Sequence, residues 1–287
     1  ERFIGKNDAF PVKGWSLDSQ LHSVPDCQSI AKKAAVDHLG THYGLSWLPE
    51  TGETYQLRFS IMKDICEVFL DTSGASLHKR GYRAIANEAP LHETMAAALV
   101  NLARYRGRDF FWDPFCGSGT IAIEAALIAK NRAPGLERSF SAQRWACVPA
   151  QAWMDAADEA MDREFDGAYE IWGGDIDPKA VAIARDNAVK AGVEDLIRFE
   201  VADARAFRRE APYGRVVTNP PYGERIMEKR EAEELYRAFG KAYRGLPPGW
   251  SLALLSSHTE FERCFGKTAD KKRKLYNGMI KCDLFMY

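Results

Sequence analysis

An Asn-Pro-Pro-Tyr stretch at residues 219–222 carries groups that could hold an amino group on a planar ring. The side-chain oxygen of Asn219 and the backbone oxygen of Pro220 could both accept hydrogen bonds from one NH2 group. Tyr222 offers an aromatic face for stacking, and the two prolines restrict the backbone so that the oxygens would point in fixed directions. The stretch predicts a receptor for an exocyclic amino group of a base, although taken alone it could be only a rigid loop.

An amino group of this kind is a poor nucleophile because its lone pair is delocalised into the ring. Hydrogen bonds from both of its N–H groups would help to localise the lone pair and aim it at an electrophile. Catalysis would then rest on positioning and electrostatics, without a covalent intermediate and without a metal. We therefore predict that Asn219, Pro220 and Tyr222 are the catalytic residues.

A glycine-containing turn, DPFCGSGT at residues 113–120, follows an apolar run and precedes a helical pattern. Glycines let the backbone approach a ligand closely, and a helix N-terminus presents unpaired N–H groups. Thr120 follows Gly119 where a triphosphate-binding loop would have Lys. A dinucleotide turn needs a third glycine and an acidic residue about 20 positions later, whereas Asp175 lies 175 − 119 = 56 residues on. The turn predicts a cofactor site of another kind, or else a tight turn without a ligand.

Acidic residues end the next two predicted strands. Asp175 is placed to accept hydrogen bonds from two ribose hydroxyls, and Ile176 could lie against an adenine face. Asp177 could contact the ligand or simply cap the helix that begins at Pro178. Asp203 could accept the adenine amino group, or it could be an ordinary surface aspartate; its place at the same edge of the sheet favours function.

The elements that position these residues alternate along the chain from about Gly107 onward. Short apolar runs followed by amphipathic helical stretches are typical of a parallel sheet with helices on both faces. A closing hairpin, turned at Asn277–Gly278, would add an antiparallel pair. The predicted strands are 109–113, 169–175, 196–203, 215–219 and 250–257, and the predicted helices are 119–130, 178–192 and 231–244.

The N-terminal part has a different pattern. A helix-like stretch at 27–39 precedes two alternating strands, 55–62 and 65–72, joined by Lys63 and Asp64. We expect a small α+β module. The predicted division is an N-terminal module at 1–78, a junction with a leading amphipathic helix at 79–106, and a catalytic domain at 107–287.

Composition narrows the class of protein. The chain has 287 residues, of which 46% are hydrophobic, so it can bury a full-sized core. No apolar run approaches the roughly 20 residues that cross a bilayer, so we expect a cytoplasmic protein without a membrane partner. Six scattered cysteines predict neither disulfides nor a structural metal. The chain begins at Glu1 rather than Met, and we expect that an N-terminal piece precedes it.

Together these motifs resemble the class I S-adenosylmethionine-dependent methyltransferases, a Rossmann-like α/β fold, and among them the THUMP-domain RNA guanine-N2 methyltransferases. The matching stretches are LDTSGASLHKRGYR, APLHETMAAAL, DPFCGSGTIAIEAALIA, GGDIDP, TNPPYGER and KLYNGMIKCDLFMY. The resemblance implies a target guanine at Asn219–Tyr222 and a partial THUMP-like RNA-binding module at 1–78. It also implies that S-adenosylmethionine is held by Asp113, Pro114, Phe115, Cys116, Gly117, Ser118, Gly119, Thr120, Asp175, Ile176, Asp177, Asp203, Ala204 and Asn219.

Basic residues agree with a nucleic-acid substrate. We predict that Lys79, Arg80 and Arg83 contact RNA phosphates, although a charge cluster is more often a solvated face. Large-subunit rRNA is the preferred substrate, with tRNA next. The alternatives are a DNA adenine-N6 methyltransferase, a protein-glutamine methyltransferase and a non-catalytic RNA-binding protein. The resemblance also implies that Glu93 could lie close to the methionine end of the cofactor; a helix-surface carboxylate is an equally good account.

Overall fold

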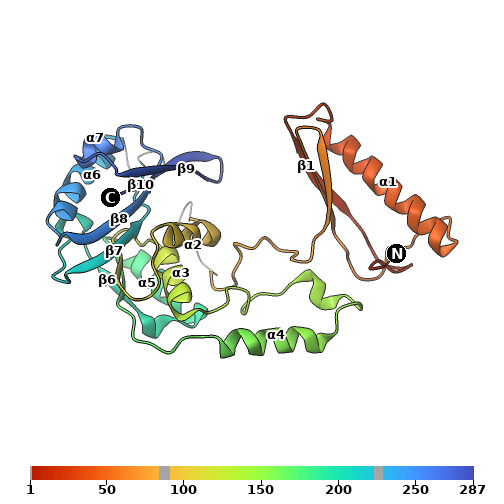
Figure 1. Ribbon diagram of the computed structural model, residues 1–287, viewed down its shortest axis with the longest axis horizontal. Coiled ribbons are helices and arrows are strands. Elements are labelled where there is room, and N and C mark those ends of the chain that lie inside the picture. Colours follow the sequence, from red (N-terminus) through yellow and green to blue (C-terminus); the bar gives the residue numbers. More distant parts are fainter. Residues whose placement is uncertain (1, 84–90, 223–228) are drawn as a thin grey trace. The chain divides into compact units, whose positions relative to one another are not determined.

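The structure is a computed structural model that describes residues 2–83, 91–222 and 229–287 (Figure 1). Its contacts divide the chain into two compact units. The first comprises Glu1–Leu77 and Ser139–Asp158, and the second comprises His78–Arg138 and Glu159–Tyr287. The end of the TNPPYGER stretch, from residue 223, lies outside the described residues.

The second unit is built on a seven-stranded sheet with the order β6-β5-β4-β7-β8-β10-β9. The pairs among β4 to β8 are parallel, whereas β10 pairs antiparallel with both β8 and β9. This confirms the predicted, mostly parallel sheet with a C-terminal antiparallel hairpin. The strands are β4 (Phe110–Asp113), β5 (Ile171–Asp175), β6 (Ile197–Val201), β7 (Tyr213–Thr218), β8 (Gly249–Ser256), β9 (Lys271–Asn277) and β10 (Ile280–Met286).

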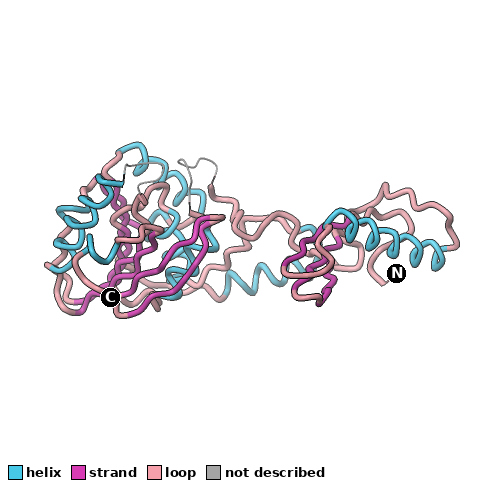
Figure 2. The backbone as a smooth tube through the Cα atoms, turned by 90° about the horizontal axis from the view of Figure 1, so that it is seen from above, coloured by secondary structure: helices cyan, strands magenta, loops and turns pink. Residues whose placement is uncertain are grey.

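Helices cover both faces of this sheet (Figure 2). Successive strand residues point to opposite faces, so Phe111 belongs to one hydrophobic core and the next residue, Trp112, belongs to the other. The core containing Phe111 is closed by α2, α3 and α5, and the core containing Trp112 by α6 and α7. The helices are α2 (Glu93–Leu102), α3 (Thr120–Lys130), α5 (Pro178–Ala191), α6 (Lys229–Arg244) and α7 (Phe261–Phe265).

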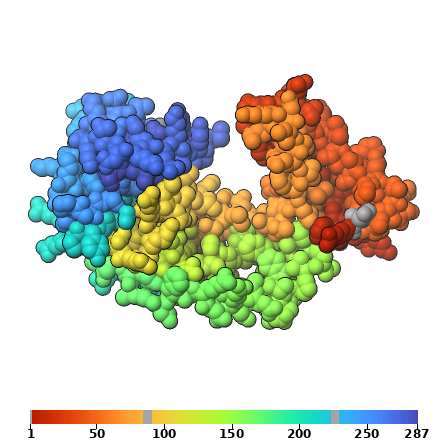
Figure 3. All heavy atoms as spheres, in the orientation of Figure 1, coloured from red at the N-terminus to blue at the C-terminus, as the bar shows by residue number. Residues whose placement is uncertain are grey.

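The C-terminal hairpin turns one residue later than the sequence predicted. Asn277 and Ile280 are the last paired residues, so Gly278 and Met279 form the loop. Gly278 has a φ of 62°, a left-handed conformation that a two-residue hairpin turn favours at glycine. The hairpin, dark blue in Figure 3, projects from the second unit, and Met279 at its tip is 97% exposed.

The first unit contains a three-stranded sheet with the order β1-β2-β3. β1 (Val12–Leu17) runs parallel to β2 (Leu57–Met62), and α1 (Val24–Tyr43) connects them. β2 and β3 (Ile65–Leu70) form an antiparallel hairpin through Lys63 and Asp64, as the alternation predicts. The prediction lacked β1 and began α1 three residues late, at Cys27.

Residues 139–158 belong to the first unit, although the predicted division placed them in the catalytic domain. Within this insertion, Trp145 stacks on Tyr55 with ring centroids 4.6 Å apart. Its indole N–H donates a hydrogen bond to the backbone oxygen of Thr54 at 3.0 Å. The insertion thus completes the core of the first unit before α4 (Ala150–Asp162) leads the chain back.

No helix in the described ranges is both long enough and apolar enough to cross a membrane.

Candidate active site

A cavity of about 1010 Å³ lies where β4, β5, β6 and β7 end. The strand order reverses at β4, and in open α/β sheets ligands bind outside the carboxyl ends of the strands at such a reversal. The cavity joins the glycine turn, the strand-end acids and the Asn-Pro-Pro-Tyr stretch. The predicted site residues that line it are Asp113, Pro114, Phe115, Cys116, Gly117, Ser118, Thr120, Asp175, Ile176, Asp177, Asp203, Ala204, Asn219, Pro220 and Tyr222.

The glycine turn is shaped by left-handed residues and by close packing. Gly117 and Gly119 have φ values of 52° and 83°, which side chains other than hydrogen rarely allow. Gly119 does not line the cavity; a Cβ there would lie 2.9 Å from the Cβ of Ala184 on α5. The Asn187 side chain donates a hydrogen bond to the Ser118 carbonyl at 3.0 Å. Gly119 therefore allows α3 and α5 to pack closely and does not contact a ligand in the cavity.

Asp175 braces the turn from the end of β5. One carboxylate oxygen accepts the Gly117 N–H at 2.9 Å, and the other accepts the Asp177 N–H at 3.0 Å. Each oxygen keeps a further lone pair, so both could still accept a ligand hydroxyl. Asp177 itself accepts the Lys179 N–H at 2.9 Å and caps α5, which is the structural role that the sequence allowed for it.

Asp113 lies at the floor of the cavity, with 1% of its surface exposed. It accepts a hydrogen bond from the Thr218 hydroxyl at 2.6 Å and thereby joins the ends of β4 and β7. Burial raises the pKa of Asp113 to about 7. The side chain acts as a buried brace between the glycine turn and the strand that precedes Asn219.

Asp203 is engaged by a neighbour that the sequence argument missed. Both of its oxygens accept hydrogen bonds from the Arg205 guanidinium, the shortest at 2.6 Å. Hydrogen bonding by Arg205 lowers the pKa of Asp203. An amino group that used this carboxylate would have to share it with Arg205, which also lines the cavity.

The Asn-Pro-Pro-Tyr stretch is held by hydrogen bonds from two tyrosines. The hydroxyl of Tyr222 donates to the Asn219 side-chain oxygen at 2.5 Å, and the hydroxyl of Tyr236 on α6 donates to the Pro221 carbonyl at 2.6 Å. Burial raises the pKa of Tyr222, so its hydroxyl stays protonated and able to donate. Among the described residues, no group donates to the carbonyl oxygen of Pro220, which lines the cavity. That oxygen is therefore a candidate acceptor for a ligand.

Several cavity residues were not among the predicted site residues. Asn277 and Ile280 come from the hairpin, and Leu91 precedes α2. The hairpin stretch KLYNGMIKC matched the family pattern, but its place beside the cavity follows only from the strand order. Nothing in the pattern of α6 distinguished Glu231 and Glu234, which also line the cavity.

The predicted RNA contacts of Arg80 and Arg83 need correction. The Arg80 and Arg83 side chains are only 12% and 11% exposed, and they pair with Glu124 and Glu93 at 3.5 Å in each case. Arg83 also donates to the Thr120 hydroxyl at 2.8 Å. Both arginines thus neutralise buried glutamates behind the cavity, whereas Lys79 is exposed.

The charges of the cavity suit a cationic ligand that carries a nucleoside. Among the described residues, six acidic side chains and one cation, Arg205, line the cavity; the acids are Asp113, Asp175, Asp177, Asp203, Glu231 and Glu234. No cluster of potential ligands within the described chain is arranged for a metal ion. S-adenosylmethionine carries a sulfonium, an ammonium and one carboxylate, and so has a net positive charge. The exposed side chain of Ile176 supplies an apolar surface beside the acids.

Residues 80–285 match the UPF0020 family, described as an RMKL-like methyltransferase domain. A Bacillus subtilis protein named "Putative RNA methyltransferase YpsC" is 46% identical over 288 residues, which covers 99% of this chain and 74% of that protein. The ribosomal RNA large subunit methyltransferase K/L of Shewanella baltica is 40% identical over 229 residues, 78% of this chain. The matched region is only 32% of that longer enzyme.

Solved structures agree with these sequence relationships. SMU.472, described as "a putative methyltransferase complexed with SAH", superposes with a TM-score of 0.90 at 40% identity, covering 99% of this chain and 76% of its own. A Listeria monocytogenes protein described as a predicted N6-adenine-specific DNA methylase has a TM-score of 0.91 at 48% identity, with coverages of 99% and 74%.

Proposed function

We propose that this chain, which belongs to the UPF0020 family of RMKL-like methyltransferases, methylates the N2 amino group of a guanine in RNA. The chain is a methyltransferase, and its methyl donor is S-adenosylmethionine. One observation carries the proposal: a single cavity contains both the glycine turn with Asp175 and the acceptors of the Asn-Pro-Pro-Tyr stretch. Donor and base amine would therefore meet in one enclosure.

The donor would be held by the glycine turn and the strand-end acids. Asp175 would accept the ribose hydroxyls, while Ile176 and Asp203 would flank the adenine. When bound, S-adenosylmethionine supplies an electrophilic methyl group on a sulfonium sulfur. Because the turn is tied to Asp175 and to Asn187 before a ligand arrives, the site would need little reorganisation on binding.

The base would be held by the other half of the cavity. The carbonyl oxygen of Pro220 and the side-chain oxygen of Asn219 would accept the two N–H groups of the guanine amine. Asn219 can do so while bonded to Tyr222, because an amide oxygen has two lone pairs. The ring of Tyr222 would then support the base. Presenting the amine requires the nucleotide to leave its stack.

RNA as the substrate is supported by the names of the relatives, and large-subunit rRNA by the K/L enzymes in particular. We further propose that the first unit is the later part of a THUMP-like RNA-binding module. Its strands β1 to β3 and helix α1 form a small α+β body of the expected kind. Lys79, which is exposed where the second unit begins, would contribute a phosphate contact.

Adenine N6 methylation is the second candidate. Adenine also presents an exocyclic NH2, which the same acceptors would accommodate, and the Listeria protein is described as a predicted N6-adenine-specific DNA methylase. A tRNA substrate would be equally compatible with the site.

Radiolabelled methyl transfer tests these options. The protein is incubated with labelled S-adenosylmethionine and unmodified total RNA, the rRNA and tRNA fractions are separated, and the labelled nucleoside is identified by mass. Genomic DNA serves as the parallel substrate. We expect N2-methylguanosine in rRNA. Label only in N6-methyladenine of DNA would overturn the proposal.

A further inference from the structure

A second cavity of about 940 Å³ lies at the opposite edge of the same sheet. It is formed by the link between α2 and β4, by the end of α3 and by the segment around Phe165. Arg215, near the start of β7, also lines it, whereas Asn219 follows the end of β7. All of these residues belong to the second unit. We call this cavity the arginine groove.

The lining of the arginine groove is strongly basic. Within the described ranges, its lining contains six arginines and one acid, Asp109, a formal charge of 6 − 1 = +5. Three of the arginines have carboxylate partners: Arg132 with Glu164 at 2.8 Å, Arg163 with Glu159 at 2.6 Å, and Arg215 with Asp109 at 2.7 Å. These pairs reduce the charge that the groove offers to a ligand, but only in part.

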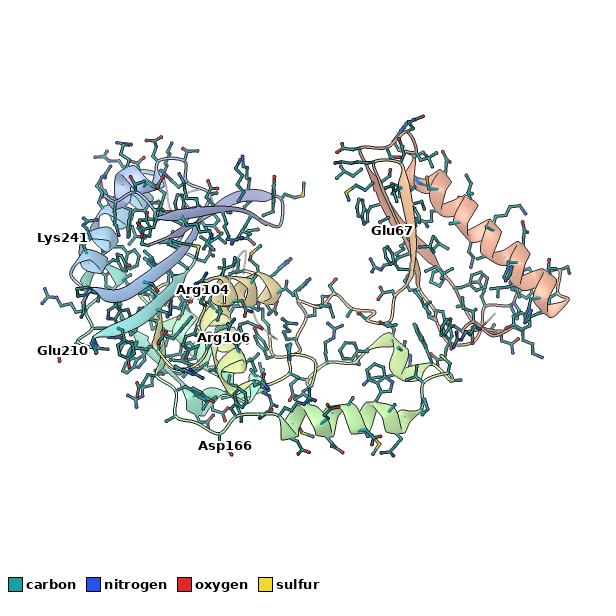
Figure 4. The ribbon with its side chains drawn as sticks, in the orientation of Figure 1. Glu67, Arg104, Arg106, Asp166, Glu210 and Lys241 are labelled. Atoms are coloured by element: carbon teal, nitrogen blue, oxygen red, sulfur yellow. The ribbon has the colours of Figure 1, made fainter. Side chains whose placement is uncertain are left out.

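The other three arginines, Arg104, Arg106 and Arg108, are exposed. No carboxylate of the described chain lies within ion-pair distance of them. Arg106 is held by hydrogen bonds to the Asn101 side-chain oxygen at 3.2 Å and to the Tyr105 carbonyl at 2.8 Å. Figure 4 labels Arg104 and Arg106 on the link between α2 and β4. Three cations within five residues thus lack an internal anion.

The backbone at Arg104 supports a role for its side chain. Arg104 has a φ of 58° directly after the end of α2, where glycine or asparagine would fit with less strain. A left-handed conformation is less stable for an ordinary L-residue than for glycine. An arginine at this position therefore keeps its charge in the groove at a conformational cost.

The chemistry of the arginine groove fits phosphate. A guanidinium group presents a planar set of donors that matches the oxygens of a phosphate. The described lining of the active-site cavity, in contrast, contains more acidic than basic residues and would not attract a polyanion. Asn219 follows Arg215 by four residue steps along the chain, which is about 13 Å along a strand. A polynucleotide, but not a mononucleotide, is long enough to reach both edges of the sheet.

We propose that the arginine groove binds the phosphate backbone of the RNA whose target base enters the active-site cavity. This inference rests on the proposed RNA substrate. The groove would contribute affinity and orientation without reading sequence. The arginine groove lies at the end of the sheet where β4 and β7 begin, opposite the active-site cavity. RNA affinity would therefore depend on the folded RNA around the target nucleotide and not on that nucleotide alone.

The test removes the three unpaired charges and measures RNA binding as a function of salt. We compare R104Q/R106Q/R108Q with K190Q/R198Q/K241Q, a control that removes equal charge from exposed positions outside both cavities. Each phosphate contact contributes about 0.7 to 0.9 to the slope of log affinity against log salt. The groove variant is expected to lose about 2 to 3 from that slope, and the control variant less than about 1.

Two further variants test whether a loss of RNA binding comes from misfolding or from the loss of charge. R104G/R106Q/R108Q relaxes the left-handed backbone while removing the same charges, and R104K/R106K/R108K keeps the charges. The glycine variant should bind RNA as weakly as the glutamine variant, and the lysine variant should keep most of the slope. S-adenosylmethionine affinity, measured by calorimetry, should be unchanged in all of them.

Equal slopes of log RNA affinity against log salt for the groove and control variants would overturn the inference. The same result is expected if the groove binds only small anions or a protein. If added inorganic phosphate shifts the melting temperature of the unaltered protein but the groove variant keeps the unaltered slope of log RNA affinity against log salt, the groove binds small anions and not RNA. Failure of the proposed function is read separately, from the absence of label in RNA with the unaltered protein, because the salt slope depends on binding alone.

Discussion

The hydroxyl of Tyr222 donates a hydrogen bond to the side-chain oxygen of Asn219, and so the two side chains assigned to the base orient each other. Replacing Tyr222 by Phe removes this bond but keeps the ring, whereas Ala removes both. Stacking of a base on an aromatic ring is worth about 1 to 3 kcal/mol. We expect Tyr222→Phe to keep kcat/KM for RNA within about 10-fold and Tyr222→Ala to lose much more. Equal losses would assign the essential role to the hydroxyl.

We expect Asn219 to affect the rate of methyl transfer and not the affinity for S-adenosylmethionine. Asn219→Ala removes one of the two proposed acceptors, and losing a single preorganised hydrogen-bonding group at a reacting centre costs about 100- to 1,000-fold in kcat. Single-turnover methyl transfer measures this loss. Calorimetry with S-adenosylmethionine should give a dissociation constant close to that of the unaltered protein. A parallel collapse of donor affinity would contradict the division of the cavity into two halves.

Asp175 should show the opposite behaviour. Asp175→Ala removes both a candidate ribose acceptor and the brace on the Gly117 N–H. Hydrogen bonds to charged groups contribute about 1.5 to 3 kcal/mol each, so donor affinity should fall by at least about 10-fold. The matched control is Asp177→Ala, which removes the α5 cap and should cost about 1 kcal/mol of stability with a smaller change in donor affinity. Equal donor affinities for the two variants would contradict the ribose assignment.

The raised pKa of Asp113 predicts a pH-dependent stability. A buried acid of this kind holds its proton more tightly in the folded than in the unfolded state. The stability gained is complete below the ordinary pKa of 3.8 and is lost as the pH rises through about 7. Urea unfolding between pH 5 and pH 8 should therefore show a falling free energy of unfolding. Asp113→Asn, which can still accept from Thr218, should fall less steeply.

Glu124 limits the size of that effect. Burial raises its pKa to about 7 as well, and it remains in the Asn variant, so the decline with pH should be reduced rather than abolished. An identical pH dependence in the variant and in the unaltered protein would show that Asp113 titrates near its ordinary value in the folded state.

The sheet of the second unit could be predicted because each strand and helix carries its own period and its own boundary residues. Asp177 caps α5 with its side chain, Pro178 begins it, and Gly192 ends it with a φ of 65°. The strand β1 escaped prediction because its residues, VKGWSL, alternate only weakly and include a glycine. Parallel pairing of β1 with β2 across α1 is a long-range contact that no local pattern encodes.

In the candidate site, too, some residues could be predicted from local sequence and others could not. Residues at strand ends could be assigned because parallel strands deliver their carboxyl ends to one edge, and the cavity contains almost all of them. Partners set by packing could not be foreseen. The ion pairs of Arg80 and Arg83 with buried glutamates and the bond from Tyr236 to the Pro221 carbonyl depend on how helices α2, α3 and α6 cover the sheet. A basic residue in a junction gives no indication of such burial.

We predict that residues 139–158 contribute much of the stability of the first unit. Trp145 is 3% exposed, stacks on Tyr55 and donates to the Thr54 carbonyl. Truncation of a buried tryptophan to Ala costs about 3 to 5 kcal/mol. Trp145→Ala should therefore strongly increase amide hydrogen exchange in β1 to β3, while Trp47→Ala, at a residue that is 71% exposed, should change it little. Donor affinity should persist in both variants, because the donor cavity lies wholly within the second unit; its loss in Trp145→Ala would show that the second unit requires the first to fold.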